Sequence, residues 1–301
     1  MKKSDRRLAN RYLNLLEAAL VGTLYGDPPN DTWSGKQYDA RARALGHDWP
    51  SLAQTMIGTV RMRNLRHLCE EAIFNEIPGD FVETGVWRGG ACIYMRGILN
   101  AYGETGRRVF AADSFKGLPP PDAEFPADAG DTLHTRDQLA VSRAEVEENF
   151  RRYGLLDDKI VFLEGWFKDT LPNAPIDKIA VLRLDGDMYE STIQALDSLY
   201  HKVSAGGAVI IDDYFLQACA KAVTDFRNKH GIVAPLIPVD TCAVLNRGGS
   251  FDPRLSWVDD CIGVDQELPG TCDQGGVVGF ATCGEARVEF DQGFVPAECG
   301  G

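Results

Sequence analysis

Apolar and polar positions divide the 301-residue chain into three zones. In residues 1–79, apolar side chains recur every three or four positions, which predicts amphipathic helices. From 80 to 249, short apolar runs alternate with longer helical patterns. From 250 to 301, glycine is frequent and neither period holds, so the role of this zone stays open. We therefore expect an N-terminal helical cap or lid, one central domain and an acidic extension.

The central zone predicts a Rossmann-like α/β fold. Short apolar strands that alternate with helices are typical of a parallel sheet covered on both faces. Two weaker extended segments predict a C-terminal antiparallel hairpin, which makes a mostly parallel seven-stranded sheet. One long loop is rich in proline and aspartate, and loops of this length within a compact domain usually have a functional role. The expected strands are 81–83, 109–112, 160–163, 179–184 and 208–211, the hairpin 234–239 and 242–245, the helices 91–102, 142–153, 189–202 and 216–230, and the loop 115–133.

Charge and composition disfavour several classes of protein. A formal charge of −13 argues against a protein built to bind nucleic acid. No apolar run approaches the ~20 residues of a membrane-spanning helix. The basic start of the chain continues as an amphipathic helix rather than as a signal peptide. The eight cysteines form no CxxC pair, so no zinc cluster is expected. These features predict a cytoplasmic protein without nucleic-acid or membrane partners.

The first predicted strand runs into a glycine-rich turn, Glu83-Thr84-Gly85-Val86-Trp87-Arg88-Gly89-Gly90. Its glycines let the backbone pass close to a ligand, and their spacing differs from the GxGxxG of dinucleotide-binding turns. The acid before the first glycine favours a ligand with a positive group, such as S-adenosylmethionine. Asp113, at the end of the second strand, can accept hydrogen bonds from ribose hydroxyls. A tight strand–helix turn and a helix cap are the structural alternatives.

Three acids, Asp185, Asp212 and Asp213, end two further strands. Carboxylates that converge at neighbouring strand ends repel one another unless a cation binds. Hard divalent cations prefer oxygen ligands, and Mg²⁺ keeps waters that a substrate can displace. No histidine lies beside these acids, which disfavours zinc and non-haem iron. The structural alternative is that Asp187 and Asp213 cap helices.

Further motifs occur in order along the chain: TMIGTVRMRNL (55–65), GDFVETGVWRGGACIYMRGIL (79–99), ADSFKGLP (112–119), NFRRYGLLDDKI (149–160), GWFKDTLP (165–172), VLRLDGDMYEST (181–192) and IIDDY (210–214). Over residues 10–246 the chain resembles the macrocin O-methyltransferase family, whose members methylate sugar hydroxyls of macrolide and aminocoumarin natural products. The resemblance implies a class I methyltransferase fold, the cofactors S-adenosylmethionine and Mg²⁺, and a glycosylated small-molecule acceptor. It also implies a homo-oligomer and a role in antibiotic biosynthesis.

The resemblance further implies roles for individual residues. Asp185, Asp212 and Asp213 would hold Mg²⁺, and Asp185 would accept the proton of a sugar hydroxyl whose pKa the metal lowers. Tyr214, after the acid pair, and His134, in the long loop, are candidate substrate contacts by position, with core packing or solvent exposure as alternatives. The expected cofactor-binding residues are Met56, Glu83, Thr84, Gly85, Val86, Trp87, Arg88, Gly89, Asp113, Ser114, Phe115, Gly165, Trp166, Phe167 and Asp185.

Other functions stay open from the sequence. The same metal chemistry would serve a catechol or another phenol as acceptor. A protein that binds S-adenosylmethionine without turnover is a second alternative, and a nicotinamide oxidoreductase lacks its glycine fingerprint. Trp33 and Trp49 are expected either in a lid over the acceptor or in the core.

Overall fold

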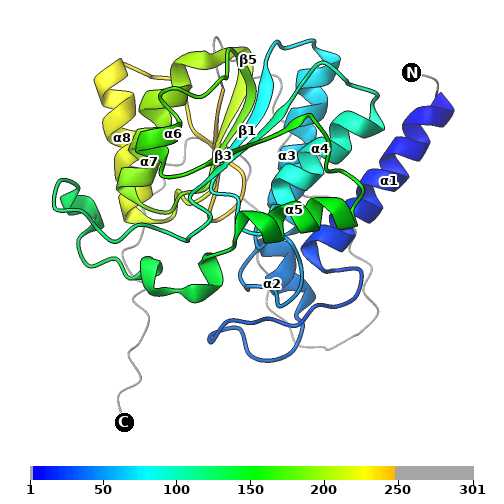
Figure 1. Ribbon diagram of the computed structural model, residues 1–301, viewed down its shortest axis with the longest axis horizontal. Helices are drawn as coiled ribbons and strands as arrows, with labels where there is room; N and C mark the ends of the chain where they lie inside the picture. Colours follow the sequence, from blue (N-terminus) through cyan, green and yellow to red (C-terminus); the bar gives the residue numbers. More distant parts are fainter. Residues whose placement is uncertain (1–2, 248–301) are drawn as a thin grey trace, which may run out of the picture. The chain divides into compact units, whose positions relative to one another are not determined.

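The computed structural model describes residues 3–247, and the extension from 250 to 301 with its cysteines lies outside the described residues. Seven strands form one sheet in the order β3-β2-β1-β4-β5-β7-β6 (Figure 1). Strands β1 to β5 pair in parallel, whereas β7 is antiparallel to both β5 and β6. The expected sheet with its C-terminal hairpin is confirmed. The strands are β1 (Asp80–Thr84), β2 (Val109–Asp113), β3 (Ile160–Glu164), β4 (Ile179–Leu184), β5 (Val203–Ile211), β6 (Ile237–Pro238) and β7 (Val244–Arg247).

Helices cover both faces of the sheet, because successive strand residues point to opposite sides. Phe81 and Ile210 pack with α1, α3, α4 and α5, whereas Val82 and Ile211 pack with α7 and α8. Figure 1 shows the two groups on opposite sides of the strands. The first helices thus share one core with the sheet, and the division at residue 79 stays a prediction. The helices are α1 (Lys3–Val21), α2 (Ala40–Leu45), α3 (Gly58–Phe74), α4 (Gly90–Ala101), α5 (Arg143–Arg152), α6 (Phe167–Thr170), α7 (Tyr189–Leu199) and α8 (Gln217–His230), with the 3₁₀ helices η1 (Pro126–Asp128), η2 (Leu133–Thr135), η3 (Asp137–Leu139) and η4 (Tyr200–Lys202).

Some element boundaries differ from the predicted ones. The strand expected at 208–211 already begins at Val203, because its pairing with β4 shifts register and so accommodates extra residues. The helix expected at 189–202 ends at Leu199 and continues as the 3₁₀ turn η4. The loop expected at 115–133 is not structureless, since it contains η1 and the first residue of η2, and the connection to α5 continues through η3 to residue 142. Among the described helices, none combines the length and the apolar character that crossing a membrane requires.

The turn between β1 and α4 lies against the end of β4. Gly85 has a φ of 86° in this turn, and its N–H donates a hydrogen bond to the carbonyl oxygen of Ala112 at 2.9 Å. A Cβ atom added to Gly85 would lie 1.6 Å from the carbonyl oxygen of Asp185. Glycine is therefore required here, and the turn passes directly beside one of the strand-end acids.

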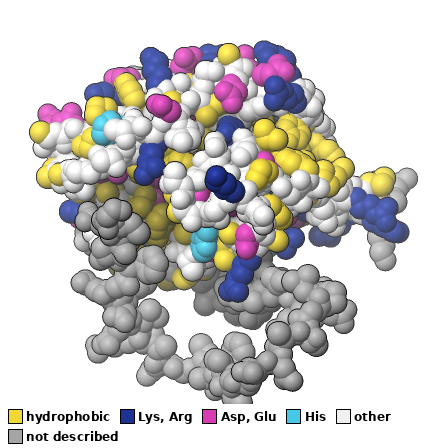
Figure 2. All heavy atoms as spheres, turned by 90° about the horizontal axis from the view of Figure 1, so that it is seen from below, with side chains coloured by type: hydrophobic (Ala, Val, Ile, Leu, Met, Phe, Trp, Pro, Cys, Tyr) yellow, Lys and Arg dark blue, Asp and Glu magenta, His cyan; other side chains and the backbone are white. Residues whose placement is uncertain are grey.

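Large hydrophobic side chains are exposed at several places on the described surface. On α1, Leu8, Tyr12 and Leu15 are 65%, 39% and 57% exposed, and their spacing places them on one face of the helix. Phe74, at the end of α3, is also exposed, and the guanidinium of Arg6 lies 5.5 Å from its ring centroid. Figure 2 shows hydrophobic side chains gathered in one area of the surface seen from below, with charged side chains spread around it.

Replacing Gly85 by alanine tests the close approach of the turn to β4. Gly103→Ala is the matched control, because Gly103 also has a positive φ, 68°, but an added Cβ there meets no atom within 4 Å. We expect Gly103→Ala to lower the free energy of unfolding by about 1–2 kcal/mol through backbone strain alone. Gly85→Ala should lower it further, because the clash with Asp185 adds to the strain. Urea unfolding measures both, and equal losses would contradict the required close approach.

Candidate active site

A cavity of about 520 Å³ opens at the carboxyl ends of the parallel strands, where open α/β sheets bind their ligands. Its walls come from the turns after β1 to β5, from the long loop after β2 and from the N-terminal segment. Most of the predicted site residues meet here. Those that line the cavity are Met56, Glu83, Gly85, Val86, Trp87, Asp113, Ser114, Gly165, Trp166, Phe167, Asp185, Asp212 and Asp213.

The other predicted site residues lie outside this lining. Arg88 donates hydrogen bonds to the carbonyl oxygens of Pro50 and Ala53 at 3.1 and 3.0 Å, and so ties the turn after β1 to the N-terminal segment. Tyr214 packs against the core on the α7 and α8 face, and His134 is exposed in η2. These positions support the structural alternatives for both residues. The remaining ones are Thr84, buried in β1, Gly89, the N-cap of α4, and Phe115, buried against Phe162.

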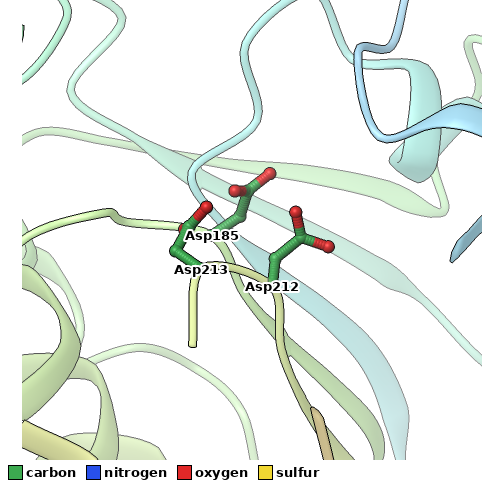
Figure 3. A group of neighbouring side chains, drawn as sticks. All are labelled: Asp185, Asp212 and Asp213. Carbon is green, nitrogen blue, oxygen red and sulfur yellow. The ribbon is translucent and has the colours of Figure 1, made fainter. Parts of the chain in front are cut away.

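Three carboxyl groups converge at the centre of the cavity floor. Asp185 follows β4, and Asp212 and Asp213 follow β5. The parallel register pairs Leu184 with Ile211, so the two strands end at the same level and present their acids together. One oxygen from each carboxyl group lies within 4.8 Å of the others. Figure 3 shows the three side chains gathered at this point. This arrangement matches the oxygen-rich site predicted from the sequence.

Arg183 offsets part of this negative charge from below. It is 1% exposed within β4. Its Nη1 lies 2.5 Å from Oε1 of Glu83 and 2.7 Å from Oδ2 of Asp185, and its Nη2 lies 2.6 Å from Oδ1 of Asp212. Burial alone would lower the pKa of Arg183, but these carboxylates raise it far above its usual value. Burial raises the pKa of Glu83 to about 7, although Arg183 opposes this shift.

A second guanidinium, from the N-terminal segment, reaches one of the same acids. Arg61 of α3 pairs with Asp212, and its Nε lies 3.2 Å from Oδ2 of Asp240 before β7. Neither arginine was expected at the site from the sequence. For Arg183 the sequence does contain a signal, since this arginine interrupts the apolar strand IAVLRL. A charge in a buried strand requires partners of opposite charge.

Carboxyl groups still outnumber guanidinium groups at the floor of the cavity. Burial raises the pKa of Asp185, and it raises that of Asp213 well above the ordinary range with help from the neighbouring acids. Burial and the charges of Asp185 and Asp212 raise the pKa of Asp187 to about 8. Burial is the first cause of each shift, and repulsion among the neighbouring acids adds to it. The donor set and this excess of negative charge both fit a divalent cation.

Helix capping does not explain why acids stand at positions 187 and 213. The first N–H groups of α7 donate to another acid, Asp128 of the long loop: Tyr189 N lies 2.7 Å from Oδ1 and Glu190 N lies 2.9 Å from Oδ2. Asp213 instead accepts a hydrogen bond from the backbone N–H of Asp187 at 3.1 Å. This role of Asp128 was not predictable from the sequence, because 61 residues separate it from Tyr189.

Asp113 joins the turns after β1 and β2. Its carboxyl group accepts hydrogen bonds from the backbone N–H of Val86 at 2.6 Å and of Phe115 at 2.7 Å. Burial raises the pKa of Asp113 above its ordinary value, although these two hydrogen bonds oppose the shift. The acid thus fixes both turns while it lines the cavity.

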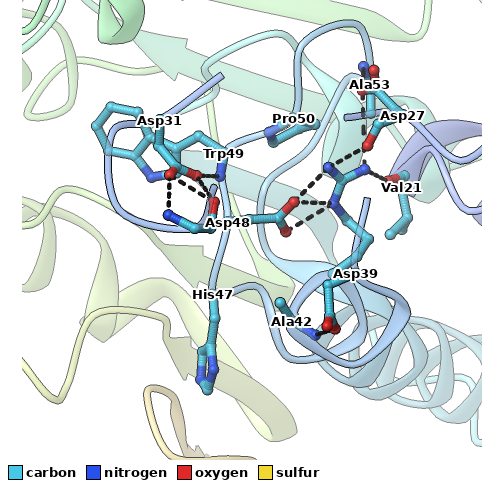
Figure 4. A network of polar contacts seen from close by, with 12 residues as sticks. Val21, Asp27, Asp31, Asp39, Ala42, His47, Asp48, Trp49, Pro50 and Ala53 are labelled. Atoms are coloured by element: carbon cyan, nitrogen blue, oxygen red, sulfur yellow. Dashed lines mark hydrogen bonds and ion pairs between the residues drawn. The ribbon is translucent and has the colours of Figure 1, made fainter. Parts of the chain in front are cut away.

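Arg43, which is fully buried, organises the N-terminal part of the cavity wall. Its Nη2 lies 2.6 Å from Oδ2 of Asp48, and it donates to the carbonyl oxygens of Val21 and Asp27, both at 2.9 Å. Asp27 in turn accepts a hydrogen bond from the backbone N–H of Ala53 at 2.8 Å. In Figure 4, Asp27 and Asp48 extend from separate loops into the same network of polar contacts.

The same segment presents two tryptophans to the cavity. Asp31 accepts hydrogen bonds from the backbone N–H groups of Trp33 at 3.0 Å and Trp49 at 2.8 Å. The two rings meet edge to face with centroids 5.1 Å apart. Both line the cavity, and Trp33 is 53% exposed. Both tryptophans therefore lie at the cavity rather than in the core.

The strand order and the strand-end site define a class I methyltransferase, which takes its methyl group from S-adenosylmethionine. The chain belongs to the macrocin-O-methyltransferase (TylF) family, whose profile it matches over residues 9–248. The family predicted from the sequence is thereby confirmed. The protein is an S-adenosylmethionine-dependent O-methyltransferase.

Individual relatives match most of the chain. It is 50% identical over 247 residues to the 8-demethyl-8-(2,3-dimethoxy-alpha-L-rhamnosyl)-tetracenomycin-C 4'-O-methyltransferase of Streptomyces olivaceus, over 81% of this chain and 94% of the relative. It is 52% identical over 237 residues to the demethyldecarbamoylnovobiocin O-methyltransferase of Streptomyces niveus, over 76% of this chain and 90% of the relative. The solved structure of the O-methyltransferase NovP matches with a TM-score of 0.78 and 49% identity, over 80% of this chain and 100% of NovP.

Removing the guanidinium of Arg43 tests whether the buried network holds the N-terminal wall. We expect Arg43→Met to lower the free energy of unfolding by about 3–5 kcal/mol, because Asp48 and Asp27 lose their buried partner. The matched control is Arg151→Met, since Arg151 is half exposed and pairs only with surface glutamates of its own helix. That control should change stability by less than about 1 kcal/mol. Similar losses in both variants, measured by urea unfolding, would contradict the role of Arg43.

Proposed function

We propose that the protein transfers a methyl group from S-adenosylmethionine to a sugar hydroxyl of a glycosylated natural product, with Mg²⁺ as a second cofactor. The observation that carries the proposal is the convergence of Asp185, Asp212 and Asp213 within 4.8 Å, beside the glycine turn after β1. The names of the relatives support the acceptor class, since one of them acts at the 4' position of a rhamnosyl tetracenomycin. We take the enzyme to be cytoplasmic and to act in antibiotic biosynthesis.

We assign the cofactor to the turns after β1, β2 and β3. Glu83 and the backbone at Gly85 would hold its amino-acid part, and Asp113 would accept hydrogen bonds from the ribose hydroxyls. The adenine would lie along the run from Gly165 to Phe167, and Met56 would lie near the methyl group. Each of these residues lines the same cavity, which supports the assignment.

The metal assignment rests on charge and on donor type. Asp185, Asp212 and Asp213 offer three carboxylate oxygens, the ligand atoms that Mg²⁺ prefers. Arg61 and Arg183 both pair with Asp212, and Arg183 also pairs with Asp185, so these two guanidinium groups face three carboxyl groups and leave negative charge uncompensated. When bound, Mg²⁺ would lower the pKa of a sugar hydroxyl next to it and so make a poor nucleophile competent.

The residues of the chain would complete the reaction. Asp185 would accept the hydroxyl proton, and Arg183 would hold the Oδ2 side of its carboxyl group in place. The hydroxyl oxygen would then form a bond to the methyl carbon as the carbon–sulfur bond breaks, which leaves a neutral thioether. Holding the two reactants in line supplies much of the rate, and Trp33 and Trp49 would exclude water from the open side.

A catechol or another phenol is the second candidate acceptor. It is favoured by the aromatic side chains of Trp33, Trp49 and Phe215 in the cavity wall, against which a flat ring can pack. Transfer of labelled methyl to a glycoside with neighbouring hydroxyls, compared with transfer to catechol, separates the two. Binding without turnover is the further alternative, and the complete set of three acids supports catalysis instead.

Replacing Asp185 by asparagine tests both the metal and the proton transfer. We expect Asp185→Asn to lower kcat by about a hundredfold to ten-thousandfold, while S-adenosylhomocysteine still binds in titration calorimetry. EDTA should abolish transfer by the unchanged enzyme, and added Mg²⁺ should restore it. The control is Asp158→Asn, an exposed acid just before the amino end of β3, whereas the cavity lies at the carboxyl ends of the strands. Full activity in EDTA or in Asp185→Asn would overturn the metal role.

We also propose that the protein forms a homo-oligomer through its N-terminal helices. The support is the exposed apolar face of α1, formed by Leu8, Tyr12 and Leu15, with Phe74 exposed at the end of α3. Burying such side chains against a second copy removes them from water, at about 25 cal/mol for each Å².

Two glutamates on this face should therefore separate the subunits. We expect the double variant Leu8→Glu and Leu15→Glu to have the mass of a monomer in size exclusion with light scattering. Its circular dichroism spectrum should be unchanged. Val233→Glu is the control, because Val233 is 93% exposed in the loop after α8. An unchanged mass of the double variant, or a monomeric parent protein, would refute the interface.

A further inference from the structure

The long loop after β2, residues 114–142, contacts other parts of the structure at two points along its length. Near its end, the indole Nε1 of Trp87 donates a hydrogen bond to the carbonyl oxygen of Gln138 at 2.8 Å. Near its middle, the ring of Phe125 lies beside that of Tyr189 on α7, with centroids 6.2 Å apart. Between these two contacts the loop places Asp128 at the first turn of the same helix.

Asp128 makes the most specific of these contacts. It is 2% exposed, and each carboxyl oxygen accepts one hydrogen bond from α7, from Tyr189 N at 2.7 Å and from Glu190 N at 2.9 Å. The residue at the N-cap position of α7, Met188, makes no side-chain capping bond. The helix therefore takes its cap from a distant loop, where a carboxylate is also favoured by the partial positive charge of the helix N-terminus.

The helix that Asp128 caps belongs to the active-site wall. It begins directly after the run Asp185-Gly186-Asp187, and it contributes Glu190, Ser191 and Gln194 to the cavity. The loop residues that line the cavity are Gly117, Leu118, Pro119, Pro120, Asp122, Leu133 and Leu139.

We infer that Asp128 is a positioning residue, which holds the long loop against α7 and so builds the acceptor side of the cavity. The inference rests on the proposed function for the identity of that side. The turns proposed to bind the cofactor have a separate support, because Asp113 links them through Val86 and Phe115. Loss of Asp128 should therefore affect acceptor binding and leave cofactor binding intact.

Hydrogen exchange and cofactor binding test this division without any acceptor. In Asp128→Ala, we expect amide exchange in peptides from residues 118–136 and in the first turn of α7 to speed up by about tenfold, as for loss of a helix cap. The affinity for S-adenosylhomocysteine, measured by titration calorimetry, should stay within about twofold, since about 0.4 kcal/mol is the largest change this allows. Asp128→Asn keeps one acceptor oxygen, so its exchange rates should lie between those of the unchanged protein and those of Asp128→Ala. This variant also serves as the test if Asp128→Ala fails to fold.

Asp131→Ala is the matched control. Asp131 lies in the same loop and also accepts a backbone hydrogen bond, but from Leu133 within the loop, at 2.7 Å. It should leave exchange in α7 unchanged. If exchange in the loop is unchanged in Asp128→Ala, or if S-adenosylhomocysteine binding weakens as much as the loop loosens, the inference is wrong.

Kinetic measurements then show whether the loss of Asp128 affects acceptor binding or the chemical step. With demethyldecarbamoylnovobiocin as acceptor probe, we expect the KM for the probe to rise by about tenfold in Asp128→Ala, with the KM for S-adenosylmethionine unchanged. A fall in kcat at unchanged KM would overturn the positioning role. If the unchanged enzyme does not methylate any glycoside, the proposed function fails, whereas the exchange and calorimetry data still decide whether Asp128 holds the loop.

Discussion

The arrangement of the active site depends on one buried guanidinium. Parallel strands place Glu83 beside Arg183 and bring Asp185 level with Asp212 at the cavity, with Glu83 and Asp212 buried. Carboxylates so placed would protonate or separate unless a positive charge lay among them. Arg183 contacts all three at 2.5–2.7 Å, and its planar donors leave little freedom for the acids to move. The distance between the acids is thus a consequence of the ion pairs beneath them.

Segments outside the sheet reach the site through further charged contacts. Arg61 connects α3 to Asp212, and Arg43 holds together the loops that carry the two cavity tryptophans. Asp128 connects the long loop to α7. A division of labour follows from this arrangement. The strand ends provide the chemistry, and the attached segments shape the space in which an acceptor must fit.

Much of the fold was predictable because its signals are local. Apolar runs of strand length alternate with helical patterns, and this order by itself predicts a parallel sheet. The strand ends were also predictable, since Asp113, Asp185 and the pair Asp212-Asp213 each follow an apolar run at once. Boundaries were less accurate where a register shift lengthened β5, because register depends on the neighbouring strand.

Contacts between distant segments could not be read in the same way. His134 and Tyr214 were reasonable candidates by position, yet neither lines the cavity, because exposure and core packing are decided by the folded surroundings. Asp128 was indistinguishable from other loop acids, although it is buried and caps a helix that starts 61 residues later. The sequence alone thus determined the class of protein, the strand-end acids and the glycine turn. The tertiary structure alone decided which charges neutralise those acids and which loops enclose them, because such pairings depend on distances between segments that are far apart in the chain.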